Sequence, residues 1–367
     1  MQLFPRITFE RMLMVLSDFF YRIIHWETWH YHAKYIPLLP SWLWYCIKSR
    51  SVWFFTASNP ALTFGGMEGE SKEEMYRRLP PETYPKSIFI SPSLSLTQLE
   101  KEITVNNFKY PFAVKPNVGM MGFMFRKINN ATDLSLYHKT MPITYVVQDL
   151  IDYPVEVSVF YYRDPDEQKG TVSGFLKKES PEVTGNGKST LRDLIQEFPG
   201  LRFKQQEMFS RHRKKLNRIL PAGEKFILSD AANRSQGGKI IGLQHEIDDN
   251  FTKIFDYISH YSGSYYYGRY DIKCASIDDL KRGINFSILE YNGCGSGIQH
   301  VYGNGYSLFE ASRIILHHWK MLYKISRTNN RNGISYWKFI TGLQFLRKAK
   351  KNLNMLKKLD REFPTFS

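Results

Sequence analysis

Two short apolar runs in the second half of the chain predict β-strands that end in oxygen-bearing side chains. Residues 265–274 include Asp271, and residues 286–292 end just before a glycine. Glu290 and Asn292 are two residues apart, so on a strand their side chains leave the same face. If the two strands pair, two carboxylates and one amide oxygen converge, and this set suits Mg²⁺. A plain β-hairpin with Asn-Gly as its turn explains the same pattern.

A strand–loop–strand pattern lies earlier in the chain. Residues 112–115 and 123–128 predict two strands, and residues 117–122 predict a flexible turn between them. Lys115 ends the first strand beside a backbone loop that could fold over phosphates. Lysine before proline is also commonplace, so this pattern alone assigns no function.

Two more extended runs lie on either side of a short bend. Gln148 lies at this bend, and Glu156 starts the second run. Farther along, apolar residues at helical spacing predict helices over residues 308–324 and 337–359. Lysines crowd the remaining faces of the second helix. It therefore fits either a helix on anionic lipid or a helix packed on its own domain with a solvated lysine face.

The first 57 residues are rich in aromatic side chains interleaved with lysine and arginine. Residues 12–24 fit an amphipathic helix, and residues 36–47 form an apolar stretch interrupted by prolines. Aromatic rings beside basic residues are typical of a membrane–water interface. A helical layer packed on the next domain, with the aromatic rings as its core and rim, explains the same composition.

Composition narrows the class of partner. The 367 residues include 50 lysines and arginines against 35 acidic residues, a formal net charge of +15. This excess predicts an anionic partner: a nucleotide, an acidic substrate, nucleic acid or a phospholipid surface. The three cysteines form no metal-ligand spacing and no disulfide framework, which fits a reducing cytoplasm. Asp18 and Arg22 interrupt the first apolar run, so no cleavable signal peptide is expected, and no run is long enough to span a bilayer.

The order of these parts resembles the ATP-grasp superfamily. A hairpin with a lysine, a bent linker ending in glutamate, and a distal Asp with a Glu-x-Asn pair follow one another over about residues 95–305. The branch it resembles most is the carboxylate–amine ligases typified by D-alanine–D-alanine ligase and cyanophycin synthetase. The resemblance implies two α+β subdomains that enclose ATP and Mg²⁺. It implies phosphate contacts at Lys115, Asn117 and Gly119, adenine contacts at Gln148, Leu150 and Ile151, a ribose contact at Glu156, and Mg²⁺ ligands at Asp271, Glu290 and Asn292.

Two further segments are similar to the same branch. The run VTGNGKSTLRDLI, residues 183–195, resembles a segment of cyanophycin-synthetase-like enzymes and places Lys188 in a loop within reach of phosphate. It is not a Walker A loop, because Glu182 stands where that motif needs glycine. The run AANRSQGGKI, residues 231–240, resembles the family's loop near the transferring phosphate. There the planar, always charged guanidinium of Arg234 fits a phosphate, and an ordinary surface loop charge is the alternative.

The resemblance departs from the family pattern in three places. Met120 and Met121 lie in the hairpin loop, where such ligases are often rich in glycine, serine or charged residues. The family ending E-x-N-x-x-P-G-x-x-H lacks its proline here, with Gly295 nearby, so the substrate-side loop is expected to differ in shape. Residues 1–90 lack the strand–helix alternation and Gly-rich turn of the usual N-terminal domain, which leaves the acceptor substrate unassigned.

Taken together, these features predict an α/β (α+β) protein with an ATP-grasp fold, an aromatic, mostly helical N-terminal region and a basic C-terminal helix. The expected parts are residues 1–90, a small subdomain over 91–150, a large subdomain over 151–330, and the helix in 331–367. The predicted activity is ATP-dependent amide formation through an acyl-phosphate. The side chains expected to balance charge on the transferring group are Arg234, Lys188, Arg269 and Lys177.

The sequence leaves the substrates and two other functions open. The carboxylate and the amine are expected to be an amino acid, a peptide, or an envelope or lipid-linked precursor. An ATP-grasp kinase would stop at phosphoryl transfer. A basic noncatalytic module with a vestigial nucleotide site would instead bind nucleic acid or a membrane, although nucleic acid is not the expected partner of the ligase. The expected location is the cytoplasm, with peripheral attachment at the inner face of the membrane.

Overall fold

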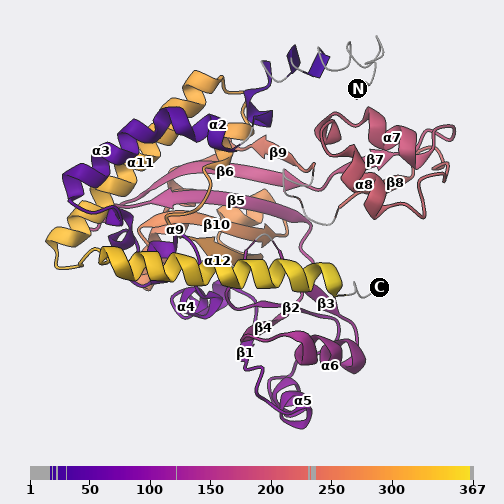
Figure 1. Ribbon diagram of the computed structural model, residues 1–367, viewed down its shortest axis with the longest axis horizontal. Coiled ribbons are helices and arrows are strands. Elements are labelled where there is room, and N and C mark those ends of the chain that lie inside the picture. The colour runs from indigo at the N-terminus through magenta and orange to yellow at the C-terminus, as the bar shows by residue number, and fades with distance from the viewer. Residues whose placement is uncertain are drawn as a thin grey trace, which may run out of the picture.

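The computed structural model describes residues 17–18, 20–21, 24–29, 31–120, 122–229, 232 and 237–363. These residues form two antiparallel sheets, a small two-stranded lobe, and a group of helices along one edge (Figure 1). The mixture of helices and antiparallel sheets confirms the predicted α+β class. Most of the predicted helix over residues 12–24 lies outside the described residues, as does the predicted site residue Arg234.

Sheet A is a four-stranded antiparallel sheet. Its strands are β1 (Ser87–Ile90), β2 (Phe112–Pro116), β3 (Arg126–Ile128) and β4 (Tyr145–Asp149), in the order β1-β4-β2-β3. The helices α5 (Leu96–Val105) and α6 (Ala131–Thr140) pack on it and share its buried core with Phe112 and Val114. Because side chains alternate along β2, Lys115 leaves the opposite face of the sheet.

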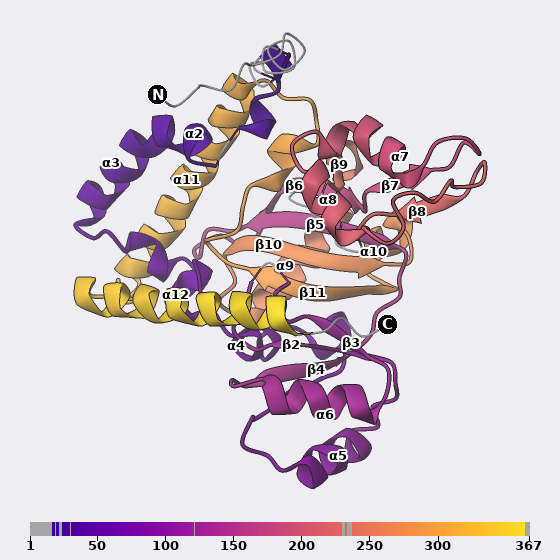
Figure 2. The same cartoon turned by 45° about the vertical axis from the view of Figure 1, so that its right-hand side comes forward.

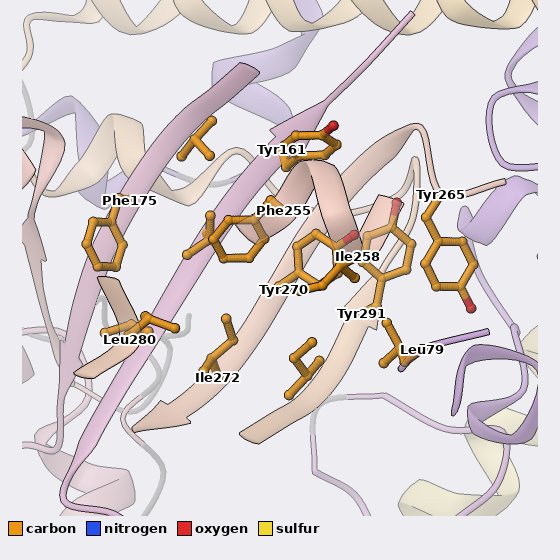
Figure 3. Packing of buried hydrophobic residues seen from close by; sticks show 14 of the residues in the cluster. Leu79, Tyr161, Phe175, Phe255, Ile258, Tyr265, Tyr270, Ile272, Leu280 and Tyr291 are labelled. Atoms are coloured by element: carbon orange, nitrogen blue, oxygen red, sulfur yellow. The ribbon is translucent and has the colours of Figure 1, made fainter. Parts of the chain in front are cut away.

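Sheet B is a five-stranded antiparallel sheet. Its strands are β5 (Val155–Tyr162), β6 (Thr171–Glu179), β9 (Lys239–Gly242), β10 (Tyr267–Cys274) and β11 (Phe286–Asn292), in the order β11-β10-β5-β6-β9. On one face, α9 (Asp249–Ser262) and α10 (Ile277–Lys281) cover an aromatic core, where Tyr161, Phe255 and Tyr270 pack together (Figure 3). The other face is apolar at one end and polar at the other, and the polar end carries the candidate site.

A small lobe follows β6. It pairs β7 (Glu182–Thr184) with β8 (Lys225–Ile227) and packs them with α7 (Leu191–Glu197) and α8 (Gln205–Arg211) around a core of its own. It projects from the side of sheet B (Figure 2). Thr190 and Asp193 form a capping box at the start of α7.

The aromatic N-terminal region packs on the helix α11 (Leu308–Arg331). Its own helices are α2 (Tyr31–Tyr35), α3 (Leu39–Ser49) and α4 (Lys72–Tyr76). Trp42 contacts Trp319 with ring centroids 5.2 Å apart, and Tyr45 stacks on Tyr323 at 4.7 Å. The sequence allowed either a membrane–water interface or a packed helical layer, and for these side chains the packed layer is correct. None of the described helices is both long enough and apolar enough to cross a lipid bilayer.

The last helix, α12 (Phe339–Glu362), runs along the molecule from the N-terminal region to sheet A (Figure 1). At its far end Leu356 is fully buried in the core of sheet A, and Asp360 forms an ion pair with Arg126 at 2.9 Å. The far end of the predicted C-terminal helix therefore packs on sheet A. Sheet A begins with β1, before the predicted boundary at residue 90, because Ser87 pairs with Gln148.

Candidate functional site

The strands β10 and β11 bring the three predicted metal ligands together. Asp271 lies directly opposite Glu290, and Arg269 lies opposite Asn292. The next pair is Ile272 with Ile288, so Leu289 is an extra residue that forms a β-bulge. The simple hairpin alternative is wrong, because α10 connects the two strands and Asn292 ends β11 rather than forming a turn between them.

Asp271 is the centre of a buried charge network. Arg269 donates to both of its carboxylate oxygens at 3.0 and 2.8 Å, and Lys178 donates at 2.9 Å. Asn292 and Ser158 donate to the same carboxylate. Burial alone would raise the pKa of Asp271, but the opposing charges of Arg269 and Lys178 hold it well below its ordinary value. The carboxylate is therefore ionised, and it positions the predicted residue Arg269.

The lysine of β6 that reaches this network is Lys178 rather than the predicted Lys177. Lys178 is buried, lies opposite Glu156 in the sheet, and approaches its carboxylate at 3.6 Å. Lys177 leaves the other side of the strand and pairs with Glu179 at 2.9 Å. Glu156 thus lies on the same face as Asp271, and the cation beside them is one residue farther along the chain than Lys177.

Lys115 bridges the two sheets. Its ammonium group donates to the Tyr76 hydroxyl at 3.1 Å and to the Leu289 carbonyl at 3.2 Å, next to Glu290. Burial lowers the pKa of Lys115 to about 8, although the nearby Glu290 carboxylate opposes the shift. The predicted phosphate-binding lysine therefore lies against the strand that carries two of the predicted metal ligands.

Tyr76 is a hub that the sequence interpretation missed. Its hydroxyl donates to the Leu289 carbonyl at 2.6 Å and accepts a hydrogen bond from Gln148 at 2.7 Å. Burial raises the pKa of Tyr76 far above its ordinary value, so the hydroxyl stays protonated. Gln148, predicted to contact adenine, also donates to Ser87 at 2.8 Å. A tyrosine in a short polar helix gives no sequence signal for this role.

The hairpin loop after Lys115 is tied to α4. The side-chain oxygen of Asn117 accepts hydrogen bonds from Ser71 and from the Glu73 amide, both at 3.0 Å, so Asn117 helps to cap α4. Lys72 donates to the Gly119 carbonyl at 3.1 Å and pairs with Glu290 at 3.3 Å. Gly119 therefore lies near Glu290, and both residues line a cavity of about 10 Å³.

The remaining predicted site residues in the described chain are Leu150, Ile151 and Lys188, which lie in other segments. Leu150 and Ile151 lie in the segment between β4 and β5, and the Ile151 carbonyl accepts from Lys273 at 3.1 Å. Lys188 is exposed on the small lobe, and the contacts it makes within the described ranges keep it in its own loop. The structure therefore does not bring Lys188 to Asp271.

The donor set on β10 and β11 fits Mg²⁺ by its chemistry. Its ligand atoms are side-chain oxygens of Asp271, Glu290 and Asn292, which are hard ligands. The amide nitrogen of Asn292 already donates to Asp271. Glu290 is partly exposed, with 37% of its side chain accessible, so its carboxylate can turn toward an ion. Among the described residues no group of three or more His, Cys, Asp or Glu side chains is placed to hold a metal ion, and this site offers two carboxylates with the Asn292 amide. The site fits an ion that takes its remaining ligands from water and phosphates.

No protein-family model matches this sequence, and no curated protein matches it. Several solved structures do match. They include D-alanine–D-alanine ligase, a D-Ala:D-Ser ligase, a bifunctional glutathione synthetase and the ATP-grasp ligase PsnB. A D-alanine–D-alanine ligase from Bacillus anthracis shares 15% identity at a TM-score of 0.42, and the match covers 72% of this chain and 69% of that one.

Two other ATP-grasp ligases match over smaller parts of their own length. The VanG D-Ala:D-Ser ligase from Enterococcus faecalis shares 17% identity at a TM-score of 0.40, with 71% of this chain and 62% of that chain covered. A bifunctional glutathione synthetase from Pasteurella multocida shares 14% identity at a TM-score of 0.39, with 68% and 35% covered. The chain therefore spans about a third of the synthetase and about three-fifths of the VanG ligase.

Proposed function

We propose that the chain is an ATP-dependent ligase that joins a carboxylate to an amine. The observation that supports this most directly is the junction of the two sheets. Lys115 from sheet A lies against Leu289, and the neighbouring Glu290 faces Asp271 across β10 and β11. A cation able to hold phosphate oxygens thus meets a set of oxygen ligands, which is the arrangement that a nucleotide with its metal ion requires.

The charges of the site complement an anionic ligand. The cationic side chains Lys72, Lys115, Lys178 and Arg269 outnumber the carboxylates of Glu156, Asp271 and Glu290 by four to three. A further carboxylate, Glu70, lines the small cavity, and burial raises its pKa, which favours its neutral form. ATP would therefore enter a site with an excess of positive charge, where preorganised cations stabilise its phosphates.

In the proposed reaction, an oxygen of the substrate carboxylate attacks the γ-phosphorus of ATP. The bond between that phosphorus and the bridging oxygen breaks, which gives an acyl-phosphate and ADP. The amine nitrogen then attacks the acyl carbon, the carbon–oxygen bond to phosphate breaks, and the amine loses a proton as the amide forms. Phosphoryl transfer of this kind needs positioning and charge stabilisation more than covalent help.

The residues of the site suit these tasks. Lys115 would hold phosphate oxygens, while Gln148 and the 150–151 segment would contact the base and Glu156 the ribose. Arg269, fixed by two hydrogen bonds to Asp271, would stabilise the charge on the transferring group. Mg²⁺, when held by Asp271, Glu290 and Asn292, would supply charge neutralisation to the phosphates.

An ADP-release screen tests the proposal. The chain with ATP and Mg²⁺ is offered amino acids, dipeptides and envelope precursors, singly and in pairs, and products are identified by mass spectrometry. We expect ADP release that requires a carboxylate and an amine together. Lys115→Ala should reduce it by roughly 100-fold or more, and Lys101→Ala, an exposed lysine of α5, should leave it unchanged.

Other outcomes would contradict the ligase. Full ADP release in Lys115→Ala would remove the proposed nucleotide site. ADP release without an amine, with a stable phosphorylated product, would identify a kinase. Failure of the chain to bind ATP in a calorimetric titration would leave only a noncatalytic binder. The predicted anionic membrane surface involves a different face of the molecule and is a separate proposal.

A further inference from the structure

Two long segments of the chain contain no acidic residue. Residues 28–67 hold neither Asp nor Glu, and residues 311–359 hold none either, while this second segment contains twelve lysines and arginines. These segments form α3, most of α11 and most of α12. From the loop after β5, Asp164 and Glu167 pair with Lys324 at the edge of α11.

The same helices expose large apolar side chains. On α3, residues 39, 43 and 47 are spaced by four and lie on the side away from Trp42 and Tyr45, which pack on α11. Leu43 and Ile47 are 58% and 67% exposed. The further exposed apolar residues are Leu39, Trp44 and Val52, together with Phe339 and Ile340 at the start of α12.

Four of these exposed apolar side chains line one open groove. It has a volume of about 860 Å³, and its walls come from α3, from the segment after it, and from the start of α12. Leu43, Ile47, Val52 and Phe339 all line it. Both views show α3 and the start of α12 at the same edge of the molecule (Figures 1 and 2). These four exposed apolar residues therefore share one surface rather than scattered positions.

Cations frame this apolar surface. Arg50 and Lys338 line the groove, and the Lys48 ammonium lies 5.1 Å from the centre of the Trp44 ring. Along α12 the exposed cations continue as Arg347, Lys348, Lys350, Lys351 and Lys358. We call the whole surface, from α3 across the groove and along α12, the α3–α12 face.

We propose that the α3–α12 face binds the surface of an anionic lipid bilayer. The apolar side chains of α3 and the start of α12 would enter the headgroup region, and Trp44 suits the membrane–water interface. The cations of α12 would bind lipid phosphates, and no carboxylate of α3 or of residues 311–359 would repel them. A nucleic acid would use the cations but would leave the exposed leucine, isoleucine and phenylalanine side chains without a partner.

The groove contains none of the residues proposed to bind ATP, although Asn352 of α12 donates to Val118 in the hairpin loop, so vesicle binding is measured without nucleotide. The test is co-sedimentation of the full chain with vesicles of phosphatidylcholine alone, or of phosphatidylcholine with roughly one third phosphatidylglycerol. We expect binding to the anionic vesicles only, reduced at high salt. Because each cation near such a surface strengthens binding by roughly fivefold, Lys348→Ala with Lys351→Ala should weaken it by roughly twentyfold.

A second pair of variants tests the apolar part of the face. Leu43→Ser with Ile47→Ser should abolish the binding that remains at high salt, because these side chains touch little else and their loss should leave the melting temperature unchanged. The lysine variant of α12 has a matched control, Lys101→Ala with Lys139→Ala, which replaces two exposed lysines of α5 and α6. This control removes the same charge from sheet A and should bind vesicles as the wild type does.

Several vesicle-binding results would overturn the proposal. They are equal binding to neutral and anionic vesicles, no binding to either, an equal loss in the Lys101 and Lys139 control, and undiminished binding by the Leu43 and Ile47 variant. A concentration-dependent dimer in size-exclusion chromatography, dissolved by Leu43→Ser with Ile47→Ser, would assign the face to a second copy of the chain and would also overturn it.

Discussion

The ammonium group of Lys115 donates a hydrogen bond of 3.2 Å to the main-chain carbonyl of Leu289. Lys115 belongs to sheet A and Leu289 to sheet B, so this bond joins the two sheets at the candidate site. Leu289 is the bulged residue of β11, and a bulge interrupts the regular ladder, so its carbonyl is open to side chains from outside the sheet. The bulge also lets Ile288 enter the core while Glu290 faces Asp271.

Replacing Tyr76 with phenylalanine tests how far this junction depends on one hydroxyl group. The ring would remain stacked on Tyr84, with centroids 4.9 Å apart, but Lys115 and Gln148 would each lose a hydrogen-bond partner. Both keep a second partner, so we expect the free energy of unfolding to fall by about 1–2 kcal/mol. Urea denaturation measures this change.

A second tyrosine provides the control for that measurement. Tyr257 is half exposed, and its hydroxyl bonds only to the exposed carboxylate of Glu82 among its hydrogen bonds in the described structure. Tyr257→Phe should change the free energy of unfolding by less than about 0.5 kcal/mol. Equal effects of the two substitutions would show that the Tyr76 hydroxyl does not stabilise the junction.

Lys115 should make stability depend on pH in the alkaline range. Burial lowers its pKa from 10.5 to about 8, so between these values the unfolded chain holds a proton that the folded chain has lost. The unfolded state then binds more protons, and the contribution of this group to stability rises as the pH rises from about 8 to 10.5. Below pH 8 the charged, buried lysine costs stability.

Lys115→Met removes this titration. At pH 7 the variant should be more stable than the wild type by up to roughly 3 kcal/mol, and the difference should shrink as the pH approaches 10. Denaturant unfolding at a series of pH values measures the difference, and Lys101→Met, an exposed substitution in α5, should show no such trend. A difference that stays constant with pH would mean that the Lys115 pKa is not lowered.

The sequence predicted the strand elements of this site because their signals are local. The apolar run at β11 has the predicted bounds, and the two-residue spacing of Glu290 and Asn292 follows from strand geometry. The convergence of the three oxygen ligands was expected only if β10 and β11 pair, and the two strands do pair. Asp271, Arg269 and Glu156 share one face of sheet B, which the register of the strands shows.

What the sequence missed depends on contacts between distant segments. The choice between Lys177 and Lys178 requires the register of β6 against β5, and one position along a strand reverses the face. Tyr76 reaches the site only because α4 packs against β11, far away in the chain. Glu182–Ile227 forms a separate lobe because β7 and β8 close around their own core, which no local pattern had indicated.

Substitutions of Asp271 and of Glu290 should differ in how strongly they affect stability and nucleotide binding. Asp271→Asn would leave the buried cations Arg269 and Lys178 without their carboxylate, and we expect a loss of about 3–5 kcal/mol in the free energy of unfolding. Glu290 is partly exposed and pairs only with Lys72 among the described ion pairs, so Glu290→Gln should cost less than about 1 kcal/mol. Thermal unfolding and nucleotide titration of both variants measure the two effects.

Glu290→Gln should nevertheless weaken Mg²⁺-dependent nucleotide binding, because the substitution removes one of the two carboxylates proposed to hold the ion. Nucleotide binding without Mg²⁺ should change little in the same variant. Glu100→Gln, on the exposed surface of α5, is the matched control and should bind as the wild type does. Wild-type affinity of Glu290→Gln at every Mg²⁺ concentration would exclude Glu290 as a metal ligand.

The end of α12 should restrain the hairpin loop that follows Lys115. Asp360 accepts hydrogen bonds from the Met124 amide at 2.8 Å and from Arg126 at 2.9 Å, and Asn352 donates to the Val118 carbonyl at 3.1 Å. Asp360→Asn keeps the size of the side chain but removes the charge that holds Arg126. We expect the Met124 amide to exchange its hydrogen at least about tenfold faster, because a charge-assisted hydrogen bond is worth about 1.5–3 kcal/mol. Glu362→Gln, an exposed substitution two residues farther along α12, should leave that rate unchanged, and equal rates in the two variants would show that Asp360 does not hold the loop.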